Sequence, residues 1–128
     1  MVSDKEEDYL EAILFSSSDG PAGAKDVRET LCVRGSTVTE MFKRLEDKGM
    51  VNYKKYRGAE LTEKGEEIAI EVSEKHRFLV RFLKSIGVPS ERAEVEACGI
   101  EHVLSADTIG SIRSFAADLI DDFERREI

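Results

Sequence analysis

Apolar residues recur every three to four positions along most of this chain, a period that predicts amphipathic helices. Near the start, Leu10, Ile13 and Leu14 form an apolar stripe, and Ser3 followed by Glu6 has the spacing of a capping box. We therefore expect a first helix over about residues 3–15. The same pattern predicts further helices over residues 24–31, 36–48, 63–86, 90–102 and 105–123, with Thr62, Ser90 and Ser105 as N-caps of the last three.

The second and third of these helices are short and are separated only by residues 32–35. The third helix has an inward stripe of Val38, Met41, Phe42 and Leu45, and Gly49 is placed to end it. Two short helices joined by so tight a connection have the layout of a helix-turn-helix.

Residues 51–61 change to a different period. Val51 and Tyr53 alternate with polar residues, and Arg57-Gly58 is a turn sequence, so a two-stranded hairpin is expected here. A hairpin directly after a helix-turn-helix is a wing. The predicted fold is thus mainly α, with a winged helix-turn-helix domain (three helices plus a two-stranded wing) over residues 1–70 and an all-helical domain over residues 71–128.

Charge is distributed unevenly along the chain. The net charge of the 128 residues is −8, which argues against non-specific binding of polyanions by the whole molecule. Residues 34–57, however, contain seven basic side chains, Arg34 and Lys48 among them, against three acidic ones, a net of +4. A local reversal of sign on a helix-turn-helix and wing indicates DNA, although a mixed-charge surface without a ligand would have the same composition.

The helix over residues 36–48 turns small hydroxyl and basic side chains outward, as a helix that enters the major groove does. The wing carries basic residues, which suit phosphates rather than base edges. The expected DNA-contacting residues are Ser36, Thr37, Thr39, Glu40, Lys43 and Arg44 on the helix, and Lys54, Lys55 and Arg57 on the wing.

A second candidate site lies in residues 94–102. In a helix, Glu94, Cys98, Glu101 and His102 share one face, because positions i, i+4, i+7 and i+8 fall close together around the axis. Carboxylate, thiol and imidazole groups are costly to bury unpaired, and together they are ligands for a divalent transition metal. A solvated polar face is the alternative. The acidic pair in the first helix and the single histidine of the long helix are, by themselves, ordinary surface features.

Three segments resemble the diphtheria toxin repressor family of metal-dependent transcriptional repressors: STVTEMFKRLEDKGMVNYKKYRGAELTEKG, KHRFLVRFL and EACGIEHVLS. The resemblance extends over nearly the whole chain and is greatest to the short, two-domain manganese transport regulators. It implies a winged helix followed by a helical metal-binding and dimerisation domain. It also implies that the metal ligands are Asp8, Glu11, His76, Cys98, Glu101 and His102, with Glu94 as a further candidate.

The chain departs from both branches of that family. The manganese branch has a glutamate at the position of Cys98, whereas the iron branch has the cysteine but a methionine at the position of Asp8. The iron branch has a second, ancillary metal site. At two of its positions this chain has Val80 in place of a carboxylate and Glu94 in place of a histidine. A thiolate shifts metal preference away from Mn(II). We therefore expect Fe(II) first and Mn(II) second, with Co(II), Ni(II) or Zn(II) binding in vitro.

The expected function is that of a metal-dependent transcriptional repressor, a homodimer that binds a palindromic double-stranded DNA operator and is not an enzyme. The N-terminus is charged and lacks a signal-type apolar segment, and no apolar run suits a membrane, so a cytoplasmic protein is expected. Three alternatives stay open: a winged-helix regulator that senses another ligand without metal, a small metalloenzyme, and a plain dimerisation module.

Overall fold

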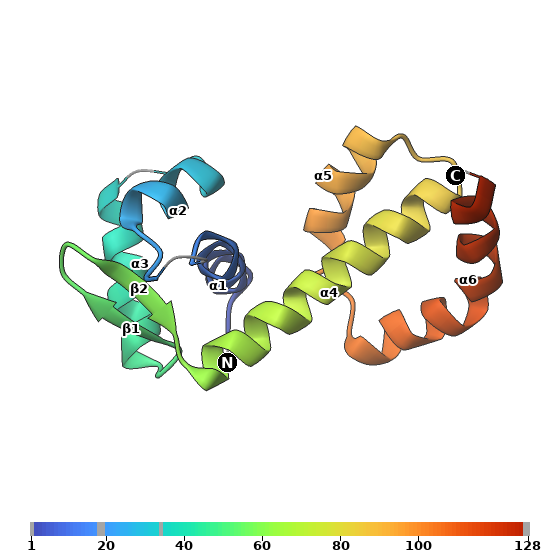
Figure 1. Cartoon of the computed structure of the whole chain (residues 1–128). Coiled ribbons are helices and arrows are strands. Elements are labelled where there is room, and N and C mark those ends of the chain that lie inside the picture. Colours follow the sequence, from blue (N-terminus) through green and yellow to red (C-terminus); the bar gives the residue numbers. More distant parts are fainter. Residues whose placement is uncertain (1, 18–19, 34, 127–128) are drawn as a thin grey trace. The chain divides into compact units, whose positions relative to one another are not determined.

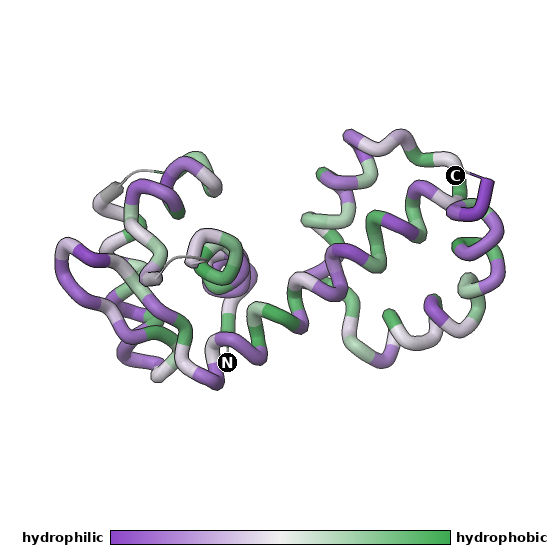
Figure 2. The backbone as a smooth tube through the Cα atoms, viewed as in Figure 1, coloured by the Kyte–Doolittle hydropathy of each residue, from purple (hydrophilic) through white to green (hydrophobic). Residues whose placement is uncertain are grey.

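The computed structural model describes residues 2–17, 20–33 and 35–126, and the chain divides into two units, Met1–Glu71 and Val72–Ile128. Helices dominate both units, and one antiparallel pair of strands lies in the first, so the expected mainly α fold is confirmed (Figure 1). Hydrophobic and hydrophilic stretches alternate along the helices, as amphipathic helices require (Figure 2). Within the described residues, no helix is both long and apolar enough to cross a membrane.

The first unit is a winged helix. It begins with α1 (Asp4–Ser16), which has the predicted capping box: Glu6 N–H donates to Ser3 Oγ at 3.2 Å, and Ser3 N–H donates to the Glu6 carboxylate at 2.9 Å. The helix-turn-helix and wing follow, and the unit closes with the start of a long helix. The elements are α2 (Ala24–Leu31), α3 (Gly35–Asp47), β1 (Val51–Lys54), β2 (Gly58–Leu61) and the first part of α4 (Glu63–Ser85).

The core of the first unit forms where α1, α2 and α3 meet the hairpin. All four residues of the predicted α3 stripe are buried, and so are Leu10 and Ile13 of α1. Phe42 and Tyr53 pack with ring centroids 5.7 Å apart, which fastens the wing to α3. The same core therefore fixes the positions of α3 and the wing relative to each other.

The hairpin turn differs from the prediction by one position. The turn comprises Lys55–Arg57, and Gly58 is already the first residue of β2, paired with Lys54. Ala22 pairs with Ala59 through two backbone hydrogen bonds of 2.9 Å, so the segment before α2 lies against the start of β2. A Cβ at Gly58, which has φ +114°, would collide with the Ala22 carbonyl. Glycine is required there both by the backbone angle and by that close approach.

The second unit contains the rest of α4 together with α5 (Ser90–Ile100) and α6 (Ala106–Arg126), which lie on opposite sides of α4 (Figure 1). Its core draws on all three helices and comprises Phe78, Leu79, Val80, Ala93, Ala97, Ile109, Ala116 and Ile120. Thr62 and Ser105 cap α4 and α6 as predicted, because each hydroxyl accepts a backbone N–H three residues on. Ser90 does not cap α5: it is the first helical residue, and Pro89 occupies the N-cap without a side-chain bond.

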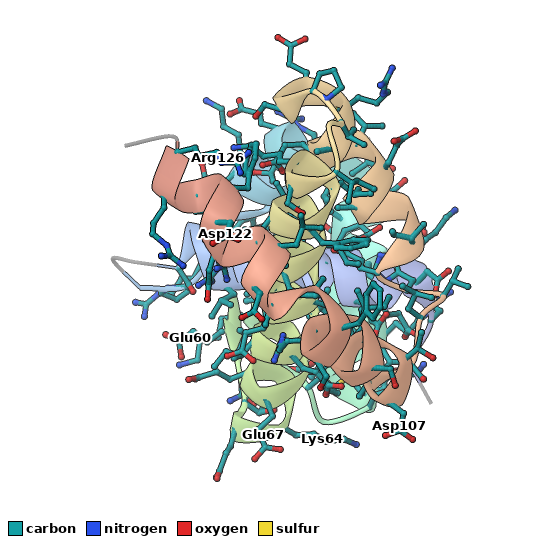
Figure 3. The ribbon with its side chains drawn as sticks, turned by 90° about the vertical axis from the view of Figure 1, so that its right-hand side faces the viewer. Glu60, Lys64, Glu67, Asp107, Asp122 and Arg126 are labelled. Atoms are coloured by element: carbon teal, nitrogen blue, oxygen red, sulfur yellow. The ribbon has the colours of Figure 1, made fainter. Side chains whose placement is uncertain are left out.

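The last helix extends beyond its predicted end at residue 123. It continues to Arg126. The Arg81 guanidinium donates two hydrogen bonds of 2.8 Å to the Glu124 carboxylate, which fastens this end of α6 to α4. Asp107 and Arg126 stand at opposite ends of α6, an order of charges that complements the helix dipole (Figure 3).

Candidate metal centre and DNA-contacting surface

The candidate metal centre of the second unit is built by α4, α5 and the turn after α5. The helix predicted over residues 90–102 is α5, and it ends at Ile100. Glu101 nevertheless keeps right-handed helical angles, and its N–H donates to the Ala97 carbonyl at 3.0 Å. Its side chain therefore still follows the face of α5 that carries Glu94 and Cys98.

His76 of α4 lies between two of the carboxylates. Its Nδ1 is 2.9 Å from Oε2 of Glu101, and its Nε2 is 2.8 Å from Oε2 of Glu94. His102 also lies close, with Nε2 3.4 Å from Oε1 of Glu101. Four of the predicted ligand side chains thus form one connected cluster within this unit.

Glu101 is the buried centre of the cluster. Its side chain has no exposed surface, and its Oε1 accepts no hydrogen bond from the described residues. Burying a carboxylate oxygen without a hydrogen bond is costly, and a cation bound beside that oxygen would offset the cost. The surrounding imidazole and carboxylate groups are suitable ligands for a divalent transition ion. The residues present therefore fit a metal centre.

The remaining predicted ligands are distributed over both units. Cys98 follows Glu94 by one turn of α5; its side chain is exposed, and neither it nor Cys32 is in a disulfide. Asp8 and Glu11 lie in α1 of the first unit, three residues apart and both half-buried. Their participation in one ligand set with the residues of the second unit stays a prediction.

The predicted DNA-contacting residues lie on the surface of the winged helix. On α3, Thr39 is half-buried and the others are exposed; the three basic residues predicted on the wing are also exposed. Arg34, which was counted in the basic stretch, lies outside the described residues. Lys48, also in the basic stretch, forms an ion pair within the first unit: its ammonium lies 2.7 Å from the carboxylate of buried Glu6 in α1. The exposed basic side chains of the predicted set therefore lie on α3 and at the tip of the hairpin.

Tyr56 is a surface residue outside the predicted DNA-contacting set. It sits in the hairpin turn with 93% of its surface exposed and φ +70°, and the Lys55 ammonium lies 5.2 Å from its ring centroid. The available signal was an aromatic residue between basic ones, in Lys54-Lys55-Tyr56-Arg57.

The first unit is a winged helix with exposed basic residues on α3 and the wing, and the second unit holds a buried carboxylate between two histidines. This combination is expected of a metal-responsive DNA-binding protein. The chain matches two family descriptions, "Iron dependent repressor, N-terminal DNA binding domain" over residues 1–59 and "Iron dependent repressor, metal binding and dimerisation domain" over residues 62–128. The chain therefore belongs to the iron-dependent repressor family, and the resemblance noted in the sequence is confirmed. The family consists of transcriptional regulators rather than enzymes.

Individual relatives agree with this assignment. The HTH-type transcriptional regulator MntR of Lysinibacillus sphaericus is 40% identical over 119 residues, which cover 92% of this chain and 83% of the relative. Among solved structures, T. acidophilum IdeR matches with a TM-score of 0.73 and 30% identity, covering 91% of this chain and 56% of the longer one. A manganese-dependent transcriptional repressor in complex with manganese matches with a TM-score of 0.76 and 27% identity, covering 89% and 52%.

Proposed function

We propose that this protein is a repressor whose affinity for operator DNA rises when a divalent metal binds a centre formed by Asp8, Glu11, His76, Cys98, Glu101 and His102. The observation that carries the proposal is Glu101, fully buried between two imidazoles with one oxygen left without a hydrogen bond. When bound, the metal would supply positive charge and directed bonds among groups that otherwise repel one another.

Two observations support Asp8 and Glu11 as metal ligands that link the metal to the winged helix: the family resemblance and the packing of α1. This helix packs against α2, α3 and β2 within the first unit. A bond made by either carboxylate therefore restrains the whole winged helix, α3 included, and not α1 alone. Metal and DNA would then be coupled as two ligands that favour the same arrangement of the chain, with a coupling of about 1–3 kcal/mol.

We propose Fe(II) as the preferred metal and Mn(II) as the second. Support for iron comes from Cys98, because a thiolate is a softer ligand than the carboxylate it replaces and disfavours Mn(II). Support for manganese comes from the relatives, one of which is described with that metal. An exposed thiolate beside iron is also open to oxidation, so the two metals are to be compared under anaerobic conditions.

We propose that the active form is a homodimer on a palindromic operator, acting in the cytoplasm. A twofold dimer places its two α3 helices on half-sites about 34 Å apart or a multiple of that distance. The outer face of α6 supplies a suitable contact surface. Phe115 is 91% exposed and Leu119, one turn later, is 46% exposed, whereas Ala116 and Ile120 on the inner face are buried. Exposed large apolar groups one turn apart are typical of subunit interfaces.

The test is fluorescence anisotropy with labelled DNA from upstream of the protein's own gene and of candidate metal-transport genes. Salt is kept constant, and Fe(II), Mn(II) or a chelator is added without oxygen. We expect tight binding with metal and loss of binding with chelator, with Fe(II) acting at lower concentration than Mn(II). Equal binding in metal and in chelator would contradict the proposal and favour a metal-independent regulator. The opposite order of the two metals would contradict only the assignment of iron.

A further inference from the structure

His76 lies between two carboxylates, and either of them could bind the same metal ion as His76. The two nitrogens of an imidazole lie on different edges of the ring and direct their bonds away from each other. Glu101 faces Nδ1 at 2.9 Å, and Glu94 faces Nε2 at 2.8 Å. One ion bound to His76 can therefore have only one of these two carboxylates beside it at that ring edge.

The two carboxylates differ in burial and in their surroundings. The Glu101 side chain is fully buried, has an oxygen without a hydrogen bond, and lies beside His102. The Glu94 side chain is 59% exposed. A buried, unsatisfied carboxylate with a second imidazole beside it is the stronger cation site, so the Nδ1 edge of His76 is the metal-facing edge.

We propose that Glu94 is a positioning residue of the metal centre, which accepts a hydrogen bond from Nε2–H of His76 and directs Nδ1 toward the ion beside Glu101. This inference rests on the proposed function and assigns Glu94 a role outside the ligand set. Glu94 fixes the tautomer, because a proton held on Nε2 leaves the Nδ1 lone pair for the metal. It also restrains ring rotation, and partners of this kind commonly change metal affinity about 10–100-fold.

An exposed ion pair by itself contributes little to stability, which makes the role of Glu94 testable apart from folding. Glu94→Ala removes the acceptor, and Glu94→Gln keeps an acceptor oxygen while removing the charge. Glu96→Gln is the matched control, since Glu96 is an exposed carboxylate two residues away on the same helix. Mn(II) is the metal probe, because electron paramagnetic resonance counts the free ion and so measures both affinity and the number of ions bound per chain.

We expect Glu94→Ala to weaken Mn(II) binding about 10–100-fold with an unchanged number of ions per chain. Glu94→Gln is expected to lose less, and Glu96→Gln to bind as the unmodified protein does. Loss of one ion per chain in both Glu94 variants, with the remaining affinity unchanged, would make Glu94 a ligand and overturn the proposal. Unchanged affinity and stoichiometry in both Glu94 variants would overturn it too, leaving only a surface ion pair.

A second measurement shows which nitrogen of the His76 ring carries the proton and which binds the metal. In the Zn(II)-loaded protein, long-range proton–nitrogen NMR is expected to show His76 protonated at Nε2 and metal-bound at Nδ1. In the metal-free protein, the Nε2 proton is expected to exchange more slowly than in Glu94→Ala. Metal bonded at Nε2, or identical exchange in the two proteins, would contradict the proposal. If the unmodified protein binds no metal at all, the proposed function fails and the role of Glu94 fails with it. Metal binding by the unmodified protein that is unchanged in both Glu94 variants overturns the role of Glu94 alone.

Discussion

The ammonium of Lys48, the residue directly after α3, lies 2.7 Å from Oε2 of Glu6 in α1, whose side chain is 2% exposed. Burial by itself raises the pKa of Glu6. The hydrogen bonds from Lys48 and Ser3 and the charge of Lys48 outweigh it, so the pKa lies below its usual value. This pair joins the helix that carries two predicted metal ligands to the end of the helix predicted to read DNA.

Replacing Lys48 by Met should lower the free energy of unfolding by about 1–3 kcal/mol, because Glu6 is left buried without its cation. The partial exposure of Lys48 keeps the loss below that of a fully buried pair. Chemical denaturation monitored by circular dichroism measures it. Lys25→Met, at an exposed position on α2, is the control and should change stability little. A loss no greater than that of the control would show that the pair does not stabilise the winged helix.

Replacing Glu124 by Gln should make stability less dependent on pH. The hydrogen bonds from Arg81 outweigh partial burial and hold the pKa of Glu124 below the usual 4.5. A carboxylate with a lowered pKa in the folded state stabilises above its unfolded pKa, and the stabilisation is lost as pH falls through the folded pKa. The difference between Glu124→Gln and the unmodified protein should therefore be present at pH 7 and vanish in acid. A difference that persists unchanged in acid, far below the usual pKa of a carboxyl group, would contradict this account.

Replacing Lys55 by Ala should weaken binding to all DNA sequences about equally and reduce the salt dependence of binding by about one phosphate contact. The reason is that Lys55 sits at the exposed hairpin tip, where it is expected to meet phosphates rather than base edges. Anisotropy titrations at several salt concentrations on the operator and on a scrambled sequence measure both effects. A change in sequence preference would show that the wing reads bases.

Replacing Phe115 by Asp should dissociate the dimer, because a charge on the outer face of α6 would have to be buried at the interface. We expect the dimer to weaken at least about 30-fold, as the loss of a central aromatic contact does. Analytical ultracentrifugation measures it. Ala117→Asp places the same charge at another exposed position of α6 and serves as control. If both variants dimerise as the unmodified protein does, the interface lies elsewhere.

Replacing His102 by Ala should remove the metal response of DNA binding while the helical content stays the same. His102 lies beside the buried oxygen of Glu101 and, as a largely buried imidazole, is expected to be a ligand. The measurements are anisotropy with and without Fe(II), and circular dichroism of the metal-free variant. Metal-dependent binding that survives in this variant would remove His102 from the predicted ligand set.

Local features of this protein could be predicted well from its sequence. Residues only a few positions apart determine several of these features: the bounds of α2, the α3 stripe, the capping box of Ser3 and Glu6, and the hairpin. Side-chain period and capping depend on backbone geometry over one or two turns, which a short segment carries by itself. The grouping of Cys98, Glu101 and His102 near Glu94 follows from the same local geometry.

Other features depend on contacts between distant segments. Periodicity does not distinguish Phe115 from Ala116, and only packing in the core of the second unit decides that the alanine is buried and the phenylalanine exposed. Nor does it indicate that Lys48 pairs with Glu6, 42 positions away in the sequence. The sequence by itself determined the helices, the wing and the types of ligand available. Only the tertiary structure decided which charges are paired and which apolar face is outside. It also decided that Glu94 and Glu101 face different nitrogens of His76. The reason is that burial and pairing depend on how segments distant in the sequence pack together.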